Sequence, residues 1–352
     1  MFKKSISILF LVLISTGPSS GAQYWPTLVW KKTTPQALGV DPKSIDNMFQ
    51  FVKKKQFPID SVVIVRNGYL IGELYANGID EKSLSNIYSV TKSFTSALVG
   101  IAIDEGHIKN ERQTLGSIFS KNIVIKNDPK LKNIEIRHLL TMTSGLKTRD
   151  NHLSNYSGVL KLRNAKNWVN YILSLGIEKK PGEHYNYSNG GSHMLAAILT
   201  ETTKEPVAKY AERYLFSHIG IEKYKWEKDP QGINHGYSNL QLSARDMAKL
   251  GILYLNKGRW GDKQIVNVSW IEKSLKTHSY PNKGRFNPFR LYPYNGYGYQ
   301  WWNSETVWKA DLSYRKAWGL GNKTEKQTEY FLALGYKGQY VFVLPHNSMV
   351  VV

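Results

Sequence analysis

The chain contains no cysteine among its 352 residues. This absence excludes disulfide bridges, thiol nucleophiles and metal sites built from cysteine ligands, and it fits export to an oxidising compartment. The nine histidines show no His-Glu-x-x-His spacing, and no Gly-x-Ser-x-Gly nucleophile elbow accompanies His138. The sequence therefore predicts neither a metal nor another cofactor.

Long apolar runs are also scarce, and the one that stands out lies at the start of the chain. Lys3 and Lys4 precede an apolar stretch over residues 6–14, and Ser20-Gly21-Ala22 has the small residues of a cleavage site. The stretch is short for a membrane span, so we expect a cleaved signal peptide over 1–22 rather than an uncleaved anchor. The mature protein is then expected in the periplasm or outside the cell.

Acidic residues are few: 27 Asp and Glu stand against 47 Lys and Arg. The net charge is +20, or about +18 once the charges of Lys3 and Lys4 are removed with the signal. Such a balance suits nucleic acid or an anionic surface, but the basic residues are scattered and only Lys53-Lys54-Lys55 forms a run. We predict no nucleic-acid partner and only loose contact with anionic envelope surfaces, while the oligomeric state stays open.

Local patterns predict a helix and a hairpin near the start and a helix and strands near the end. Asp41 followed by Pro42 is typical of an N-cap. The β-rich runs 61–65 and 69–75, joined by Arg66-Asn67-Gly68, predict a hairpin. Ser243 predicts the N-cap of a helix that runs to residue 254. Strands are expected over 298–302, 330–335 and 339–345.

The order of these patterns predicts an α+β fold. Hydrophobic residues make up 41% of the chain, enough for a full core. Helical patterns dominate from 104 to 237, with strands before and after them. We therefore expect a discontinuous sheet domain, 38–103 with 238–352, interrupted by a mainly helical domain over 104–237.

Two Ser-x-x-Lys pairs are candidates for a nucleophile with its own base, Ser89 with Lys92 and Ser313 with Lys316. On a helix, positions i and i+3 share a face, so the amine can take the proton of the hydroxyl. A chain of this composition contains roughly three such pairs by chance. Ser89 lies between a predicted strand pair and a long apolar helix, whereas Ser313 lies in a polar, aromatic stretch, so Ser89 is favoured.

Five motifs follow one another in the segments 87–93, 136–146, 181–189, 242–248 and 335–339. In this order they resemble the serine β-lactamase and penicillin-binding-protein superfamily, over a range from about residue 40 to the end. Within it the chain is similar to the class C β-lactamase-related serine hydrolases, which include esterases, D-stereospecific peptidases and 6-aminohexanoate-dimer hydrolases. The resemblance implies a β-lactamase/transpeptidase-like fold, in which an antiparallel sheet is flanked by helices.

The resemblance also implies roles for site residues. Ser89 would attack a carbonyl, Lys92 would accept its proton, Tyr187 would relay a proton to the leaving group, and Asn189 would orient Lys92 or the substrate. The Tyr-x-Asn motif at 187–189 is preferred to those at 237–239, 254–256 and 280–282, because it lies in a Pro-Gly turn before a predicted helix. His138 is expected to be structural rather than a triad base.

The third motif of the family is normally Lys-Thr-Gly, and Tyr336-Lys337-Gly338 occupies its place. The lysine is one position nearer the glycine and the threonine is missing, which weakens the expected recognition of a β-lactam carboxylate. The backbone N–H groups of Ser89 and Gln339 are expected to hold the oxyanion. Gly338 would let the substrate approach the strand backbone.

The expected function is that of an exported serine hydrolase that cleaves an ester or small amide. Two alternatives stay open: a β-lactamase or D-Ala-D-Ala carboxypeptidase, and a non-catalytic envelope-binding protein that keeps the fold. The chain stops at Val350-Val351-Val352, in an expected core strand, whereas related proteins continue into a helix that packs on the sheet. Either this branch lacks that helix or the reading frame is truncated.

Overall fold

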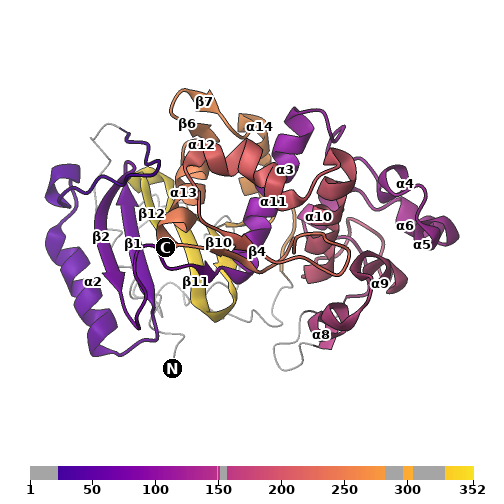
Figure 1. The fold of residues 1–352 in the computed structure, drawn as a ribbon, viewed down its shortest axis with the longest axis horizontal. Helices are drawn as coiled ribbons and strands as arrows, with labels where there is room; N and C mark the ends of the chain where they lie inside the picture. Colours follow the sequence, from indigo (N-terminus) through magenta and orange to yellow (C-terminus); the bar gives the residue numbers. More distant parts are fainter. Residues whose placement is uncertain (1–22, 149, 151–156, 282–295, 304–329) are drawn as a thin grey trace, which may run out of the picture.

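The computed structural model describes residues 23–148, 150, 157–281, 296–303 and 330–352. Within these residues the protein has an antiparallel sheet flanked by helices, which confirms the predicted α+β class (Figure 1). The predicted signal peptide over 1–22 and the second Ser-x-x-Lys pair, Ser313 with Lys316, lie outside the described residues.

The main sheet joins strands from both ends of the chain. Among the described residues its strand order is β2-β1-β12-β11-β10-β9-β8, and all paired neighbours are antiparallel. The C-terminal strand β12 lies between β1 and β11, with Val350 opposite both Val65 and Val343. The strands are β1 (Ser61–Arg66), β2 (Tyr69–Tyr75), β8 (Gly296–Tyr297), β9 (Trp302–Asn303), β10 (Phe331–Gly335), β11 (Gln339–Leu344) and β12 (Met349–Val351).

Both faces of this sheet are buried, because alternate residues of each strand point to opposite sides. Val62 and Ile64 of β1 pack with Ile45 and Met48 of helix α2 (Pro42–Lys54) in one hydrophobic cluster. Val63 and Val65 belong instead to the larger cluster that includes helices α3 (Thr91–Asp104) and α13 (Ala244–Leu255). Figure 1 shows α2 on the outer side of β1 and β2, with α3 and α13 on the other side.

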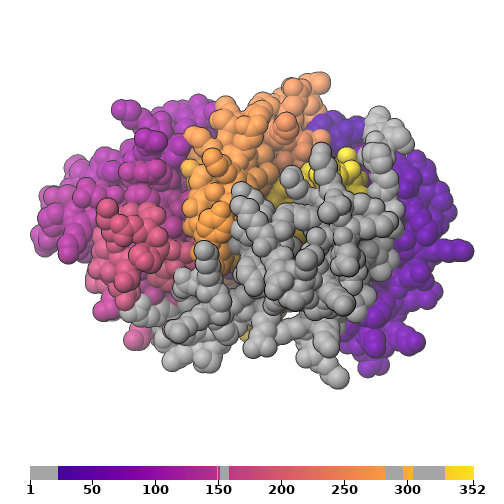
Figure 2. Space-filling view, turned by 180° about the vertical axis from the view of Figure 1, so that it is seen from behind, coloured from indigo at the N-terminus to yellow at the C-terminus, as the bar shows by residue number. Residues whose placement is uncertain are grey.

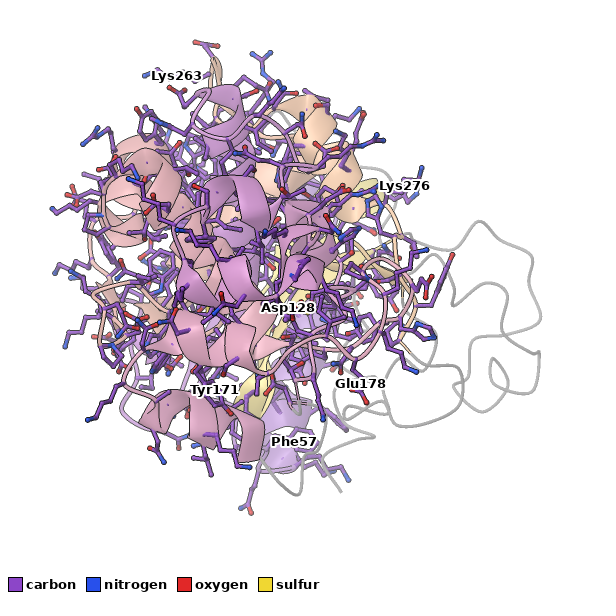
Figure 3. The ribbon with its side chains drawn as sticks, turned by 90° about the vertical axis from the view of Figure 1, so that its right-hand side faces the viewer. Phe57, Asp128, Tyr171, Glu178, Lys263 and Lys276 are labelled. Atoms are coloured by element: carbon purple, nitrogen blue, oxygen red, sulfur yellow. The ribbon has the colours of Figure 1, made fainter. Side chains whose placement is uncertain are left out.

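The segment between the two groups of strands is mainly helical and lies at the end of the molecule away from α2 (Figure 1). Seen from behind, the indigo N-terminal segment and the magenta helical segment again occupy opposite ends (Figure 2). Figure 3 looks onto the helical end, where Asp128 and Tyr171 lie. The helices and short turns are α4 (Leu115–Ile118), α5 (Ile123–Asn127), α6 (Pro129–Lys132), α7 (Ile136–Leu140), α8 (Ser157–Asn164), α9 (Trp168–Ser174), α10 (Asn189–Thr203), α11 (Val207–Ala211), η4 (Glu212–Phe216) and α12 (Ser217–Ile219).

Smaller elements complete the described part of the chain. A short sheet has the order β3-β5-β4, and β6 pairs with β7. The domain boundaries at 104 and 237 stay a prediction. The remaining elements are η2 (Gln36–Leu38), β3 (Ser85–Asn86), η3 (Tyr88–Val90), β4 (Lys225–Trp226), β5 (Leu240–Leu242), β6 (Arg259–Trp260), β7 (Lys263–Gln264), α14 (Val268–Leu275), η6 (Tyr336–Gly338) and η7 (Pro345–Asn347).

Several local predictions are confirmed. The Asp41 carboxylate accepts the N–H of Lys43 at 3.0 Å and caps α2. The β1–β2 hairpin turns at Asn67 and Gly68, which have φ of 49° and 82° and so need residues that tolerate left-handed backbone. Ser243 caps α13 by accepting the N–H of Asp246.

The strand predicted over 298–302 is wrong. The chain turns there instead: β8 ends at Tyr297, β9 begins at Trp302, and Gln300 has φ of 62°. The run is rich in residues that favour strands, but the turn buries the Gln300 amide among good partners. Its Nε2 donates to the Leu139 and Leu140 carbonyls, and its Oε1 accepts from Ser192 Oγ at 2.8 Å. These tertiary hydrogen bonds override the local preference.

Candidate active site

Ser89 and Lys92 lie at the entrance to the central helix α3. Ser89 belongs to the 3-10 turn η3, which runs directly into α3. Three residues per turn place i and i+3 one above the other, and Lys92 Nζ lies 2.9 Å from Ser89 Oγ. Before them, Tyr88 has φ of 45°, and its N–H donates to Asn86 Oδ1 at 2.8 Å. This strained residue fixes where the chain presents Ser89.

Lys92 is almost fully buried, with 2% of its surface exposed, and its Nζ has three oxygen neighbours. It donates to Asn189 Oδ1 at 2.8 Å and to the Tyr237 carbonyl at 2.9 Å. Both are acceptors only, so they use the two N–H groups of a neutral amine. The remaining lone pair then faces the Ser89 hydroxyl. The neutral amine is therefore oriented to remove the proton of Ser89.

The surroundings of Lys92 favour that neutral form. Burial, which penalises the charged ammonium, lowers the pKa of Lys92 from 10.5 to about 7, and the carboxylate of Asp150 works in the opposite direction. An amine that titrates near neutral pH can act as a base under ordinary conditions.

Tyr187 also reaches Ser89. Its hydroxyl donates to Ser89 Oγ at 3.0 Å, and the Lys92 Nζ lies 5.0 Å from the centre of its ring. The hydroxyl is thus within reach of both the nucleophile and any group bonded to it, as a proton relay requires. The structure brings Tyr187 to Ser89, and its role as the relay stays a prediction.

Asn189 is the first residue of α10. Ser188 caps this helix by accepting the N–H of Gly191 at 2.7 Å. The backbone N–H of Asn189 donates to Asp150 Oδ2 at 2.7 Å, while its side chain accepts from Lys92. Burial raises the pKa of Asp150, although the Asn189 N–H and the charge of Lys92 oppose this. Asn189 thus contacts Lys92 directly, and Asp150 holds the backbone of Asn189.

The third motif lies on the β10–β11 hairpin, but its glycine is not the one nearest the nucleophile. A Cβ on Gly335 would lie 2.5 Å from the Ile87 carbonyl and 3.4 Å from Ser89 N, so only glycine allows β10 to pass there. Gly338 has φ of 83°, and a Cβ there would meet only the Tyr340 ring. The structure gives Gly338 a turn role, and the close approach expected of it occurs at Gly335. Gln339 is paired with Gly335, and its oxyanion role stays a prediction.

Sequence reasoning missed two residues of this site. Tyr237 entered only as part of a competing Tyr-x-Asn motif, yet its carbonyl binds Lys92 and its ring centre lies 5.6 Å from Nζ. A backbone carbonyl leaves no mark in a sequence. Asp150 was not considered, and its place four residues after Leu146, at the end of the 136–146 motif, was the available signal.

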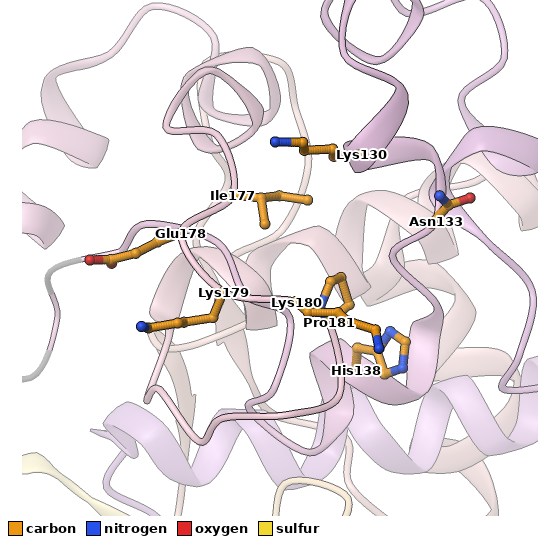
Figure 4. Close-up of a pocket in the computed structure, with 8 residues that line it drawn as sticks. All are labelled: Lys130, Asn133, His138, Ile177, Glu178, Lys179, Lys180 and Pro181. Atoms are coloured by element: carbon orange, nitrogen blue, oxygen red, sulfur yellow. The ribbon is translucent and has the colours of Figure 1, made fainter.

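His138 has the structural role expected of it, since its Nδ1 accepts the Glu135 N–H in the capping box of α7. Its ring also lines a cavity of about 490 Å³ that contains none of the residues around Lys92 (Figure 4). In the part of the chain that the structure describes, no group of three or more His, Asp and Glu side chains could hold a metal ion. The cavity is lined by Lys130, Asn133, His138, Ile177, Glu178, Lys179, Lys180 and Pro181.

A serine, a buried lysine and a tyrosine joined by hydrogen bonds beside an antiparallel sheet define a β-lactamase-type serine hydrolase site. Comparison with known families agrees: the Beta-lactamase family model matches residues 45–352. The chain belongs to this family of serine hydrolases.

Relatives of this chain have diverse descriptions. An uncharacterized protein of Alkalihalophilus pseudofirmus is 26% identical over 340 residues, covering 87% of this chain and 88% of the relative. A 6-aminohexanoate-dimer hydrolase of Paenarthrobacter ureafaciens is 20% identical over 255 residues, covering 69% and 64%. The structure of a putative 6-aminohexanoate-dimer hydrolase from Bacillus anthracis superposes with a TM-score of 0.67 at 21% identity, covering 100% of this chain and 87% of that one. The last match confirms the β-lactamase/transpeptidase-like fold.

Proposed function

We propose that this protein is an exported hydrolase that cleaves an ester or a small amide through an acyl-enzyme on Ser89. The observation that carries the proposal is the hydrogen bonding of Lys92. Its Nζ donates to two neutral oxygens, Asn189 Oδ1 and the Tyr237 carbonyl, so its lone pair is left for Ser89. A structural lysine in an interior is normally paired with a carboxylate.

In the acylation step the proton of Ser89 Oγ moves to Lys92 Nζ while Oγ forms a bond to the substrate carbonyl carbon. The carbonyl oxygen becomes an oxyanion, which needs hydrogen-bond donors already in place. The Ser89 N–H provides one donor. The hairpin provides the other, from Tyr336 beside Gly335 or from Gln339 opposite it, because Gly335 brings this backbone next to Ser89 N.

The collapse of the tetrahedral intermediate breaks the bond to the leaving group, which must take up a proton. Tyr187 donates its hydroxyl proton to the leaving oxygen or nitrogen and regains one from the Lys92 ammonium. Deacylation reverses these transfers: water gives a proton to the same pair, its oxygen bonds the acyl carbon, and Ser89 leaves with its proton restored.

The third motif favours esters and small amides over β-lactams. Lys337 lies in the hairpin turn, exposed and with φ of 59°, and the chain has no threonine in this motif. The similarity to a 6-aminohexanoate-dimer hydrolase also favours a linear amide. A β-lactamase or D-Ala-D-Ala carboxypeptidase remains the alternative hydrolase, and a non-catalytic envelope-binding protein the alternative without chemistry.

Export is part of the proposal and is supported by the sequence of residues 1–22. Within the described ranges no helix is long and apolar enough to cross a membrane. The excess of basic residues supports loose attraction to anionic envelope surfaces rather than to nucleic acid.

The test is the intact mass of the purified mature protein after treatment with a fluorophosphonate and, separately, with a penicillin. One fluorophosphonate adduct is expected, absent in Ser89→Ala and kept in Ser93→Ala, whose hydroxyl donates to the Gln300 carbonyl instead. A stable penicillin adduct would favour the carboxypeptidase alternative, and hydrolysis of the penicillin would favour the β-lactamase alternative. A folded wild-type protein without any adduct would contradict the hydrolase proposal. The same spectrum tests cleavage after Ala22.

A further inference from the structure

The segment 229–237, which delivers the Tyr237 carbonyl to Lys92, is held against two helices of the site. A Cβ on Gly236 would lie 2.3 Å from the Ser192 carbonyl of α10 and 3.1 Å from His193 Cα, so this backbone lies directly on α10. Thr95 Oγ1 of α3 donates to the Gly236 carbonyl at 3.0 Å. The position of the neighbouring Tyr237 carbonyl therefore depends on how this segment is fixed to α10.

A buried hydrogen-bonded pair, His193 with Asp229, makes that attachment. His193 Nε2 of α10 lies 3.0 Å from Asp229 Oδ2, and neither side chain is exposed. The other carboxylate oxygen of Asp229 accepts the N–H groups of Gln231 at 2.8 Å and Ile233 at 2.9 Å. Burial works to raise the pKa of Asp229, but the hydrogen bonds from His193 and the backbone outweigh it and lower that pKa. The carboxylate thus shapes the turn and ties it to α10.

Aromatic rings exclude water from this pair. Trp168 of α9 packs 5.0 Å from the His193 ring and 4.6 Å from the His235 ring, measured between ring centres. The His235 ring is stacked on Tyr237 at 5.7 Å and 6°. Burial, together with the charges of His193 and Arg163, lowers the pKa of His235 to about 4, so this ring is uncharged near neutral pH. The pair and the Tyr237 ring therefore belong to one closely packed cluster.

We propose that His193 and Asp229 are positioning residues for Lys92. His193 follows Asn189 by four residues on α10, so both lie on one face of the helix. That face presents the Asn189 oxygen to Lys92 directly and holds the Tyr237 carbonyl in place through Asp229. The pair thereby fixes both neutral acceptors that direct the lone pair of Lys92 to Ser89. This role rests on the proposed function of Lys92 as the base.

The consequence of losing the pair follows from the groups that face Lys92. These are Ser89, Tyr187, Asn189, the Tyr237 carbonyl and the carboxylate of Asp150. Around the pair itself the charged and titratable groups are His235, Tyr237 and Arg163, whose Nε lies 3.5 Å from the Tyr237 hydroxyl. If segment 229–237 separates from α10, water enters beside Lys92 and removes part of the burial that keeps its amine neutral.

The test compares His193→Met, which removes the N–H donor at similar size, with His193→Gln, whose amide still donates to Asp229. We expect His193→Met to lower kcat on a p-nitrophenyl ester by about 10²-fold, the loss typical of misplaced groups, with little change in KM. Its rate of fluorophosphonate labelling should also reach half-maximum at a higher pH than in the wild type. His193→Gln should restore both properties.

An unchanged kcat and an unchanged pH midpoint in His193→Met, with only a lower melting temperature, would overturn the positioning role. If His193→Met does not fold, kcat and the pH midpoint of labelling are measured on Asp229→Asn instead. The asparagine side chain keeps Oδ1 as the acceptor for the N–H groups of Gln231 and Ile233. A wild-type protein that forms no adduct would instead contradict the proposed function itself.

Discussion

Two buried lysines of this protein differ in the groups that their side-chain nitrogens contact. Lys92 on α3 and Lys249 on α13 are each 2% exposed. Lys249 has the Asp246 carboxylate at 2.8 Å, one helical turn earlier, and donates to the Gly220 carbonyl. Lys92 is hydrogen-bonded instead to Ser89, Asn189 and the Tyr237 carbonyl, all of them uncharged.

The difference separates a structural lysine from a chemical one. Asp246 compensates the charge of Lys249, and the pair fastens α13 to the Gly220 turn. The neutral oxygens around Lys92 hold an amine in place without compensating a positive charge. Burial can therefore lower the pKa of Lys92 to about 7. Burial alone does not leave a lysine neutral and free to act as a base; the nature of its acceptors decides.

The largest effect is expected from replacing each of the two buried lysines in turn. Lys92→Met should lower the rate of Ser89 acylation by about 10²- to 10⁴-fold, the usual contribution of a general base, and should leave the protein folded. Lys249→Met should keep acylation but lower stability by about 1–3 kcal/mol, because Asp246 loses a buried partner. Labelling kinetics and thermal unfolding of both variants measure this. Equal effects of the two substitutions on acylation would contradict the distinction.

Tyr187→Phe tests the tyrosine that lies beside Lys92 and Ser89. Removing the hydroxyl 3.0 Å from Ser89 Oγ should lower kcat by about 10²-fold, with KM nearly unchanged. The matched control is Tyr185→Phe on the same loop, whose buried hydroxyl has no partner among the described residues. Steady-state kinetics on a p-nitrophenyl ester distinguish them, and a Tyr185→Phe loss as large as that of Tyr187→Phe would refute the relay.

Asn189→Asp would make the surroundings of Lys92 resemble those of Lys249. A carboxylate 2.8 Å from Nζ favours the ammonium and should raise the pKa of Lys92. Acylation at pH 7 should then fall about tenfold or more and recover at alkaline pH. The pH dependence of fluorophosphonate labelling measures this. A loss that does not recover above pH 9 would indicate damaged geometry instead.

Asp150→Asn should have the smallest effect and the opposite sign. The Asp150 carboxylate raises the pKa of Lys92 against the effect of burial, so removing its charge should lower that pKa further. The acidic limb of the labelling profile should move to lower pH, while the asparagine oxygen can still accept the Asn189 N–H. A shift to higher pH would show that Asp150 acts on Lys92 through structure rather than charge.

Local chemistry explains which features could be predicted from the sequence. Asp41 and Ser243 cap helices through contacts with residues two or three positions away, and the Asn67-Gly68 turn is equally local. Ser89 and Lys92 are three residues apart, so their pairing follows from a helical turn. Their union with Tyr187 and Asn189 came from motif order and the family resemblance, because no local rule joins residues about a hundred positions apart.

The features that escaped prediction depend on tertiary packing. The Tyr237 carbonyl reaches Lys92 across 145 positions only because segment 229–237 packs on α10. The turn at 298–301 replaces a strand because Gln300 finds buried partners on α7 and α10. The close approach assigned to Gly338 belongs to Gly335, since the hairpin turn uses Gly338 for its positive φ.

The central claim is that Lys92 loses its proton near neutral pH and then activates Ser89. The most direct test is the second-order rate of fluorophosphonate labelling of the wild-type protein from pH 5 to pH 11, followed by intact mass. We expect a rate that rises with pH to a plateau with a midpoint near 7, the pKa of Lys92. A rate that keeps rising to a midpoint near 10.5, the value of an ordinary lysine, or one that does not vary with pH, would contradict it.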